Sequence, residues 1–171
     1  MDNLVRLDIQ EGVATLTLND PARLNPLSAP LVAGVLGALE AVRANPQVRV
    51  LVLRGQGRAF CSGANLQEFP VPGAEAPGER PSAEVIDELM ASAVNPMGLA
   101  VRDMPVPVLC AVHGAVAGGG VGLALAADMV VAARSACFYL PFVPALALVP
   151  DLGAAWYMLH SIGLARTMAL S

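Results

Sequence analysis

Three consecutive glycines, at positions 118 to 120, follow a short apolar run and precede a segment rich in Leu and Ala. Glycine loses more backbone freedom on folding than other residues, so three together indicate a turn where side chains would obstruct the backbone. Residues 121–131 read first as a helix and then as a strand. A helix that begins at the glycines presents unpartnered N–H groups at the positive end of its dipole. Such a turn either packs tightly against a strand or holds an anionic oxygen, and the glycines alone favour neither.

The first third of the chain alternates strand and helix patterns. Residues 4–9 and 13–18 alternate apolar and polar side chains around a short turn, which predicts a β-hairpin. Ser28 precedes apolar residues at helical spacing over 29–45, which predicts a helix with a serine N-cap. Residues 48–55 form a nearly continuous apolar run, typical of a strand with both faces covered.

The same alternation continues to residue 133. Residues 82–102 fit a long helix that Pro96 should break or kink. A buried strand is predicted over 105–114, followed by the glycine turn, a helix and a strand over 129–133. The order strand, helix, strand, helix, strand predicts an α/β fold with helices on the crossover connections.

Composition excludes several classes of protein. The chain has 171 residues, 56% of them hydrophobic and 14% charged, which predicts one folded domain over 1–171. A net charge of −4 argues against nucleic acid as a partner. The sequence contains no lysine, which excludes a Schiff base and a P-loop.

The cysteines, histidines and apolar runs bear on redox state and location. The three cysteines (Cys61, Cys110 and Cys137) are widely spaced, and the two histidines lie far apart, so we expect reduced thiols and no metal site. Asp128 interrupts the longest apolar run, so no membrane span is predicted. The first residues do not resemble a signal peptide, and we expect a cytoplasmic protein.

Four segments together resemble a known family. "GRAFCSGANLQEF" (57–69) and "AVHGAVAGGGVGLALAADMVVA" (111–132) resemble the two signature segments of the crotonase, or enoyl-CoA hydratase/isomerase, superfamily. Residues 18–28 resemble its early loop, and residues 148–170 resemble its later helix. The resemblance implies a crotonase-like spiral of ββα units with strands covered by helices. The chain looks like the N-terminal two-thirds of a member, a single core domain without the family's C-terminal helical part.

The resemblance implies an oxyanion hole made of two backbone N–H groups, those of Ala64 and Gly119, which hold the thioester oxygen of an acyl-CoA. Two fixed donors stabilise the enolate more than the ground state, and one such donor is worth roughly 3 kcal/mol. The implied coenzyme A contacts come from Arg23, Ala64, Asn65, Leu66 and Gly118. Arg23 is equally consistent with a solvated loop charge.

Two departures from the family pattern concern hydration. Enoyl-CoA hydratases hold water between two glutamates, and the corresponding positions here are Gly122 and Phe142. The segment around Phe142 contains no acid in any register, so hydration by two carboxylates is not supported. Two smaller departures, Asn65 in place of Asp and Ala154 in place of Gly, affect the geometry of their loops.

One acid remains in a useful position. Asp151 matches the carboxylate of family isomerases that move a double bond. Because it also precedes a predicted helix, a role as a helix cap stays open beside the catalytic one. The other polar candidates are interpreted as structural: Cys61, His113, Asp128, Trp156 and His160.

The sequence thus leaves two hypotheses. The first is an acyl-CoA enzyme, an enoyl-CoA isomerase that uses Asp151. The second is a non-catalytic acyl-CoA-binding or assembly protein with the same fold. Under both, coenzyme A is part of the substrate or ligand, no cofactor is tightly bound, and the family resemblance implies a homo-oligomer, a trimer or hexamer, for the full-length protein.

Overall fold

The structure is a computed structural model that describes residues 3–65, 88, 90–142 and 149–171. Its main sheet has the strand order β1-β2-β3-β4-β6. The strands are β1 (Val5–Gln10), β2 (Val13–Leu18), β3 (Val50–Gly55), β4 (Val108–Val112) and β6 (Met129–Ala132). β1 and β2 pair in antiparallel fashion, and the remaining neighbours are parallel.

The predicted β-hairpin is confirmed. β1 and β2 pair from Val5↔Leu18 to Gln10↔Val13, which leaves a two-residue turn. Both turn residues are left-handed, with φ of 51° at Glu11 and 83° at Gly12. This is the backbone of a two-residue hairpin turn whose twist matches that of the strands.

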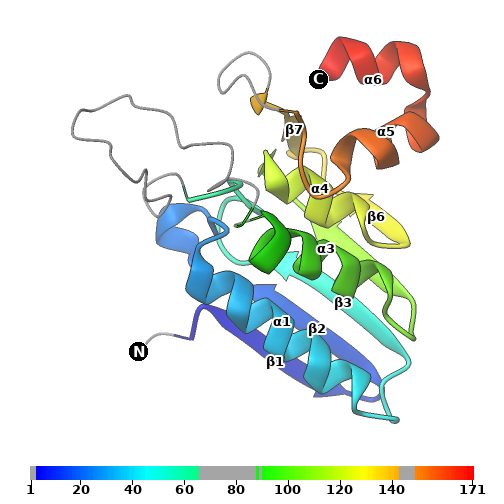
Figure 1. Ribbon diagram of the computed structural model, residues 1–171. Coiled ribbons are helices and arrows are strands. Elements are labelled where there is room, and N and C mark those ends of the chain that lie inside the picture. Colours follow the sequence, from blue (N-terminus) through cyan, green and yellow to red (C-terminus); the bar gives the residue numbers. More distant parts are fainter. Residues whose placement is uncertain (1–2, 66–87, 89, 143–148) are drawn as a thin grey trace.

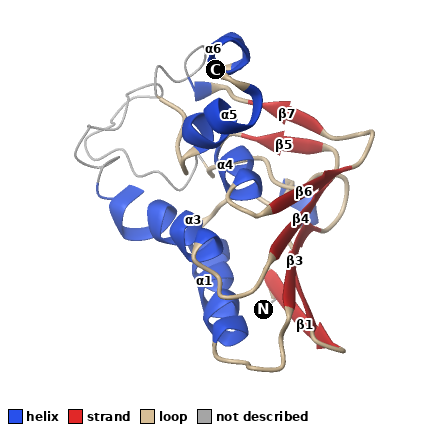
Figure 2. Cartoon of the chain, turned by 90° about the vertical axis from the view of Figure 1, so that its right-hand side faces the viewer, coloured by secondary structure: helices blue, strands red, loops and turns tan. Residues whose placement is uncertain are grey.

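Helix α1 (Ala29–Arg43) begins as the sequence predicts. The Ser28 hydroxyl oxygen accepts the N–H of Leu31 at 3.4 Å, which satisfies one of the unpartnered donors of the first turn. Leu31, Val35 and Leu39 are fully or almost fully buried at a spacing of four residues. Figures 1 and 2 show α1 lying along the sheet, where it contacts β1 and β2.

Of the predicted helix over 82–102, the structure describes residue 88 and residues 90–102. A π-helical segment, η2 (Met90–Val94), leads into α3 (Asn95–Arg102). Pro96 lies in the first turn of α3, where its missing N–H removes no helical hydrogen bond. The predicted break is therefore a change of helix type beside the proline, with α3 packed next to α1 (Figure 1).

A second, two-stranded sheet and three short helices complete the described chain. β5 (Ala115–Ala117) pairs in parallel with β7 (Cys137–Tyr139). Between β5 and β7 along the chain come α4 (Gly119–Leu125) and β6. After β7 come α5 (Ala154–Ile162) and α6 (Leu164–Leu170). Gly163, with φ of 79°, separates these two helices. Figure 2 places the two-stranded sheet and the three helices at the β6 end of the main sheet.

The main sheet has its core on one face. In β3, Leu51 and Leu53 are buried against the helices, whereas Arg54 is exposed and the other side chains of that face are half-buried. The expectation that helices cover both faces of this strand thus holds for one face within the described residues (Figure 2). None of the helices described has the length and apolar content needed to cross a bilayer.

Candidate active site

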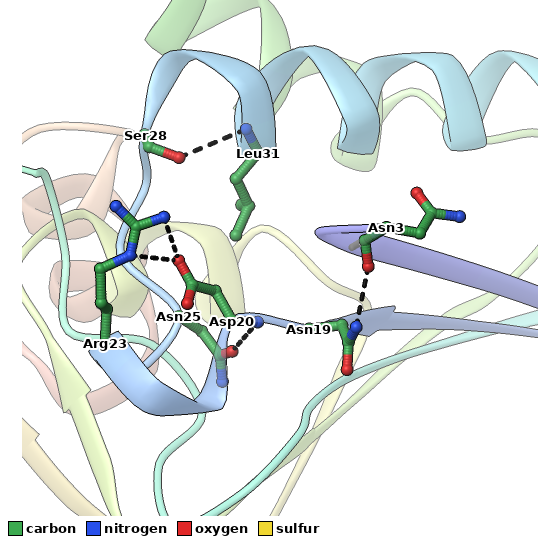
Figure 3. Close-up of polar contacts among 7 residues, drawn as sticks. All are labelled: Asn3, Asn19, Asp20, Arg23, Asn25, Ser28 and Leu31. Carbon is green, nitrogen blue, oxygen red and sulfur yellow. Dashed lines mark hydrogen bonds and ion pairs between the residues drawn. The ribbon is translucent and has the colours of Figure 1, made fainter. Parts of the chain in front are cut away.

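The early loop is anchored by one buried amide. Asn25 is fully buried and left-handed, at φ 53°, a conformation that Asn tolerates better than most residues. Its Nδ2 donates to the carbonyl oxygens of Gln56, Ala59 and Phe60 at 3.0, 3.0 and 3.1 Å. Its Oδ1 accepts the N–H of Asp20 at 2.8 Å (Figure 3). Asn25 therefore ties the loop to the end of β3, a role that the sequence analysis did not identify.

Arg23 is held by an ion pair on the same loop. The Asp20 carboxylate is buried, and its Oδ2 accepts Arg23 Nη2 at 2.7 Å and Arg23 Nε at 2.8 Å (Figure 3). Arg23 itself lies in the short 3₁₀ turn η1 (Pro21–Arg23) and has a half-exposed side chain. The residue proposed to meet coenzyme A is thus also the counter-ion of Asp20.

Backbone pairing brings the two signature segments side by side. Cys61 bridges Val116 in parallel, and the Ala117 N–H donates to the Cys61 carbonyl oxygen at 2.9 Å. A Cβ placed on Gly63 would lie 3.3 Å from Gly118 Cα and 2.8 Å from the Ala117 carbonyl oxygen. Ala64 and Gly119, the residues that directly follow this contact, are therefore close neighbours.

The early loop pairs with the other side of the Ala64 segment. The Leu27 N–H donates to the Gly63 carbonyl oxygen at 2.8 Å, and Leu27 bridges Ala64 in parallel. Among the hydrogen bonds of the described residues, none uses the Ala64 N–H. The Gly119 N–H belongs to the first turn of α4, where helical geometry supplies no partner. The two N–H groups of the proposed oxyanion hole thus lie on adjacent segments, and within the described residues neither takes part in the pairing of those segments.

The glycine triplet has a conformational reason at Gly118 and a packing reason at Gly119 and Gly120. Gly118 is left-handed, at φ 52°, and its N–H donates to the Tyr139 carbonyl oxygen at 2.9 Å. A Cβ on Gly120 would lie 3.0 Å from Cys61 Sγ. A Cβ on Gly119 would lie 3.0 Å from Leu27 Cδ1 and 3.3 Å from Asp151 Oδ1. The turn is therefore tightly packed, and at Gly119 it faces a carboxylate.

Asp151 is the acid beside this turn. Its Oδ1 is buried and has no hydrogen-bond partner within the described part of the chain. Helix α5 begins three residues later, its N-cap is Gly153, and no side chain caps it. The alternative role of Asp151 as a side-chain helix cap is therefore not realised, although its carbonyl oxygen accepts the Ala154 N–H.

Burial sets the acidity of Asp151. Loss of hydration raises the pKa of this carboxyl from 3.8 to about 6, and a hydrogen bond from its own backbone N–H opposes part of that rise. A carboxyl with a pKa near 6 is ionised at neutral pH yet binds a proton readily. Such a group can take a proton and give it back.

The position of the missing hydratase glutamate is filled by another side chain. A Cβ on Gly122 would lie 2.4 Å from Leu152 Cβ and 2.9 Å from the Leu152 carbonyl oxygen. Real Cβ atoms do not approach this closely, so any residue larger than glycine at 122 displaces Leu152. Phe142, at the second glutamate position, is buried, and its Cζ lies 3.9 Å from the place of a Cβ on Gly118.

The remaining candidates have structural partners. A ring nitrogen of His113, Nε2, is hydrogen-bonded to the Gly57 carbonyl oxygen at 2.8 Å. The Asp128 carboxylate accepts the Val108 N–H at 2.8 Å. Trp156 and His160 lie on the exposed side of α5 with ring centroids 4.2 Å apart. Asn65 is half-buried next to Ala64, and Leu66 lies outside the described residues.

Cys61 lies under the glycine turn as an inert thiol. It is fully buried, and burial raises its pKa to about 12, with the negative charge of Asp151 adding to the rise and the Gly63 N–H opposing it. Burial also raises the pKa of Cys110. Neither side chain forms a thiolate at neutral pH, so neither fits a nucleophile.

Thiol labelling tests this assignment. In the native protein, a disulfide reagent such as 5,5′-dithiobis(2-nitrobenzoate) is expected to react rapidly with Cys137 alone, because Cys137 is exposed and the other two are buried. All three thiols of the sequence should react in urea. Rapid native labelling at Cys61, located by peptide mass mapping, would contradict the buried position under Gly120.

Comparison with known proteins identifies the family of this chain. Residues 8–171 match the family model described as Enoyl-CoA hydratase/isomerase. A "Probable enoyl-CoA hydratase" of Rhodobacter capsulatus is 38% identical over 167 residues, 98% of this chain and 60% of that protein. The 1,2-epoxyphenylacetyl-CoA isomerase of Escherichia coli is 40% identical over 164 residues, 95% of this chain and 60% of that protein. The crystal structure of an enoyl-CoA hydratase from Mycobacterium avium subsp. paratuberculosis has a TM-score of 0.82 at 32% identity, covering 98% of this chain and 62% of that one.

The chain belongs to the enoyl-CoA hydratase/isomerase family and has the α/β crotonase fold of its solved members. It spans about 60% of the length of the curated relatives it matches. Those relatives are named both as hydratases and as isomerases, so the comparisons define the family without choosing the reaction.

Proposed function

We propose that this protein is an acyl-CoA isomerase that moves a double bond through a thioester enolate, with Asp151 carrying the proton. The observation that supports this most directly is the buried Asp151 Oδ1, which has no partner in the described chain and faces Gly119. A buried carboxylate oxygen without a hydrogen-bond partner is costly to keep, and such groups are typical of functional sites. A relative of 40% identity is also named as an isomerase of a coenzyme A thioester.

The proposed reaction needs one acid and two N–H groups. In a 3-enoyl-CoA the Asp151 carboxylate removes a proton from C2, and the electron pair of that C–H bond delocalises onto the thioester oxygen. The N–H groups of Ala64 and Gly119 stabilise the oxygen's negative charge. When the dienolate takes the proton back at C4, the double bond lies between C2 and C3 and Asp151 is again ionised. Coenzyme A is part of the substrate, and the step requires no further cofactor.

The substrate's coenzyme A part is proposed to run along the two signature segments. Arg23, Asn65, Leu66 and Gly118 are the residues that the family resemblance assigns to it. The Arg23 side chain is paired with Asp20 and is 55% exposed, so a phosphate can still reach it.

A paired assay tests the proposal. With a 3-enoyl-CoA such as 3-hexenoyl-CoA, formation of the 2-enoyl product should be seen as rising absorbance of the conjugated thioester. With crotonyl-CoA, water addition should be absent or very slow, because glycine and phenylalanine occupy the glutamate positions at 122 and 142. Hydration at ordinary enzyme rates would overturn the assignment of the reaction.

The second hypothesis, a non-catalytic acyl-CoA-binding protein, is the alternative outcome of this assay. Tight binding of an acyl-CoA without turnover of either substrate would favour it. The raised pKa of Asp151 argues for catalysis, since a binding site gains nothing from a buried carboxyl that ionises at neutral pH.

A further inference from the structure

Leu152 follows the acid of the site, and its backbone is left-handed, at φ 49°. This conformation is uncommon for a residue other than glycine, asparagine or aspartate, and it costs free energy that the surrounding packing must offset. The side chain is 5% exposed, so the conformation turns a large apolar group inward.

Three glycines on two helices make room for this side chain. A Cβ on Gly119 would lie 3.3 Å from Leu152 Cδ1, and a Cβ on Gly98 would lie 2.8 Å from Leu152 Cδ2. On Gly122 the corresponding distance to Leu152 Cβ is 2.4 Å. Leu152 therefore spans from α4 to α3, and one of its methyl groups lies at Gly119, where the Asp151 carboxylate also lies.

We propose that Leu152 is a positioning residue that keeps water away from the Asp151 carboxylate, so that the proton taken from the substrate is returned to it without exchanging with solvent. The exclusion of water by Leu152 rests on packing alone. The return of the proton to the substrate rests on the proposed function as well. The Cys61 thiol lies close enough to Asp151 to feel its charge, and it stays neutral and offers no competing proton at neutral pH.

Two variants of Leu152 separate size from chemistry. Leu152→Ala leaves a space beside the Asp151 carboxylate. A water molecule can enter this space because the carboxylate offers it a hydrogen bond. Leu152→Met keeps the apolar volume and should behave as the wild type. Leu51→Ala, in the buried core of β3, is the matched control for loss of stability without a change at the site.

The first readout is the titration of Asp151 and needs no substrate. The wild type should lose stability as the pH rises from 3.8 to about 6, the ordinary and the raised pKa of Asp151, and Leu152→Ala should lose less, because hydration lowers the raised pKa toward its ordinary value. Leu152→Met and Leu51→Ala should keep the wild-type pH dependence. An unchanged pH dependence in Leu152→Ala would overturn the claim that Leu152 excludes water.

The second readout is isotopic and measures proton return. In D₂O the wild type should give a 2-enoyl product with little deuterium at C4, whereas Leu152→Ala should raise that deuterium content by about threefold or more as water reaches the carboxylate. Leu51→Ala should lower the active fraction without changing the deuterium content per turnover. Equal deuterium content in Leu152→Ala and the wild type would overturn proton return, and absence of any product in the wild type would instead overturn the proposed function.

Discussion

Asp151→Asn is expected to lower isomerisation by at least roughly a hundredfold, the lower end of general acid–base contributions. Asparagine has nearly the same size and fits the same space beside Gly119, but it cannot carry a proton. Folding and acyl-CoA binding should persist, because the oxyanion N–H groups belong to the backbone of Ala64 and Gly119. Initial rates check the loss of isomerisation, and acyl-CoA affinity measured on the same preparation checks that binding persists.

The same substitution should raise stability. Since the folded state raises the pKa of Asp151, ionisation opposes folding: the penalty is absent below pH 3.8 and fully present above about pH 6. The advantage of Asp151→Asn over the wild type in urea unfolding should therefore grow by about 2 kcal/mol between pH 4.5 and 7.5. Unchanged isomerisation, or a variant less stable than the wild type at pH 7.5, would contradict the role given to Asp151.

Asn25→Asp should lower the free energy of unfolding by about 3 kcal/mol or more, since a buried polar group left unsatisfied costs about 1–3 kcal/mol and a charged one more. The substituted carboxylate cannot donate to the carbonyl oxygens of Gln56, Ala59 and Phe60, and it places negative charge against them. The segment that carries Ala64 follows directly after Phe60, so activity should fall with stability.

Asn45→Asp is the matched control for this change. Its side-chain oxygen accepts the Gln47 N–H near the surface, and an aspartate keeps that acceptor. Urea unfolding of this variant should differ from the wild type by only about 0.5 kcal/mol. Similar losses in the two variants would mean that the amide of Asn25 does not anchor the loop.

Local patterns predicted the elements that have local causes. The hairpin over 4–18 follows from alternation around a short turn, and α1 follows from Ser28 and the spacing of its apolar residues. The three glycines predict a turn that is close-packed or holds an oxygen, and the structure shows close packing at Gly119 and Gly120 and a positive φ at Gly118.

Features that depend on long-range contacts could not be predicted from local sequence patterns. β5 and β7 pair although about twenty residues separate them along the chain. Each strand has only three residues, which is too short for an alternating pattern to be detected in the sequence. Asn25 lies in a polar loop, where an asparagine is ordinary, and only the fold brings three carbonyl oxygens to it. The family resemblance identifies Asp151. That its Oδ1 is buried without a partner in the described chain depends on contacts with distant segments, which the residues around position 151 do not reveal.

The contact between Gly122 and Leu152 bears on how a member of this family with such a sequence can gain a second carboxylate over evolutionary time. A Cβ at 122 would lie 2.4 Å from Leu152 Cβ, and also 2.9 and 3.0 Å from the backbone carbonyl oxygens of Leu152 and Asp151. Because every substitution at 152 keeps those carbonyl oxygens, a smaller side chain at 152 does not by itself make room for a glutamate at 122. The backbone of 151–152 has to shift as well, so gaining that glutamate is coupled to the position of Asp151.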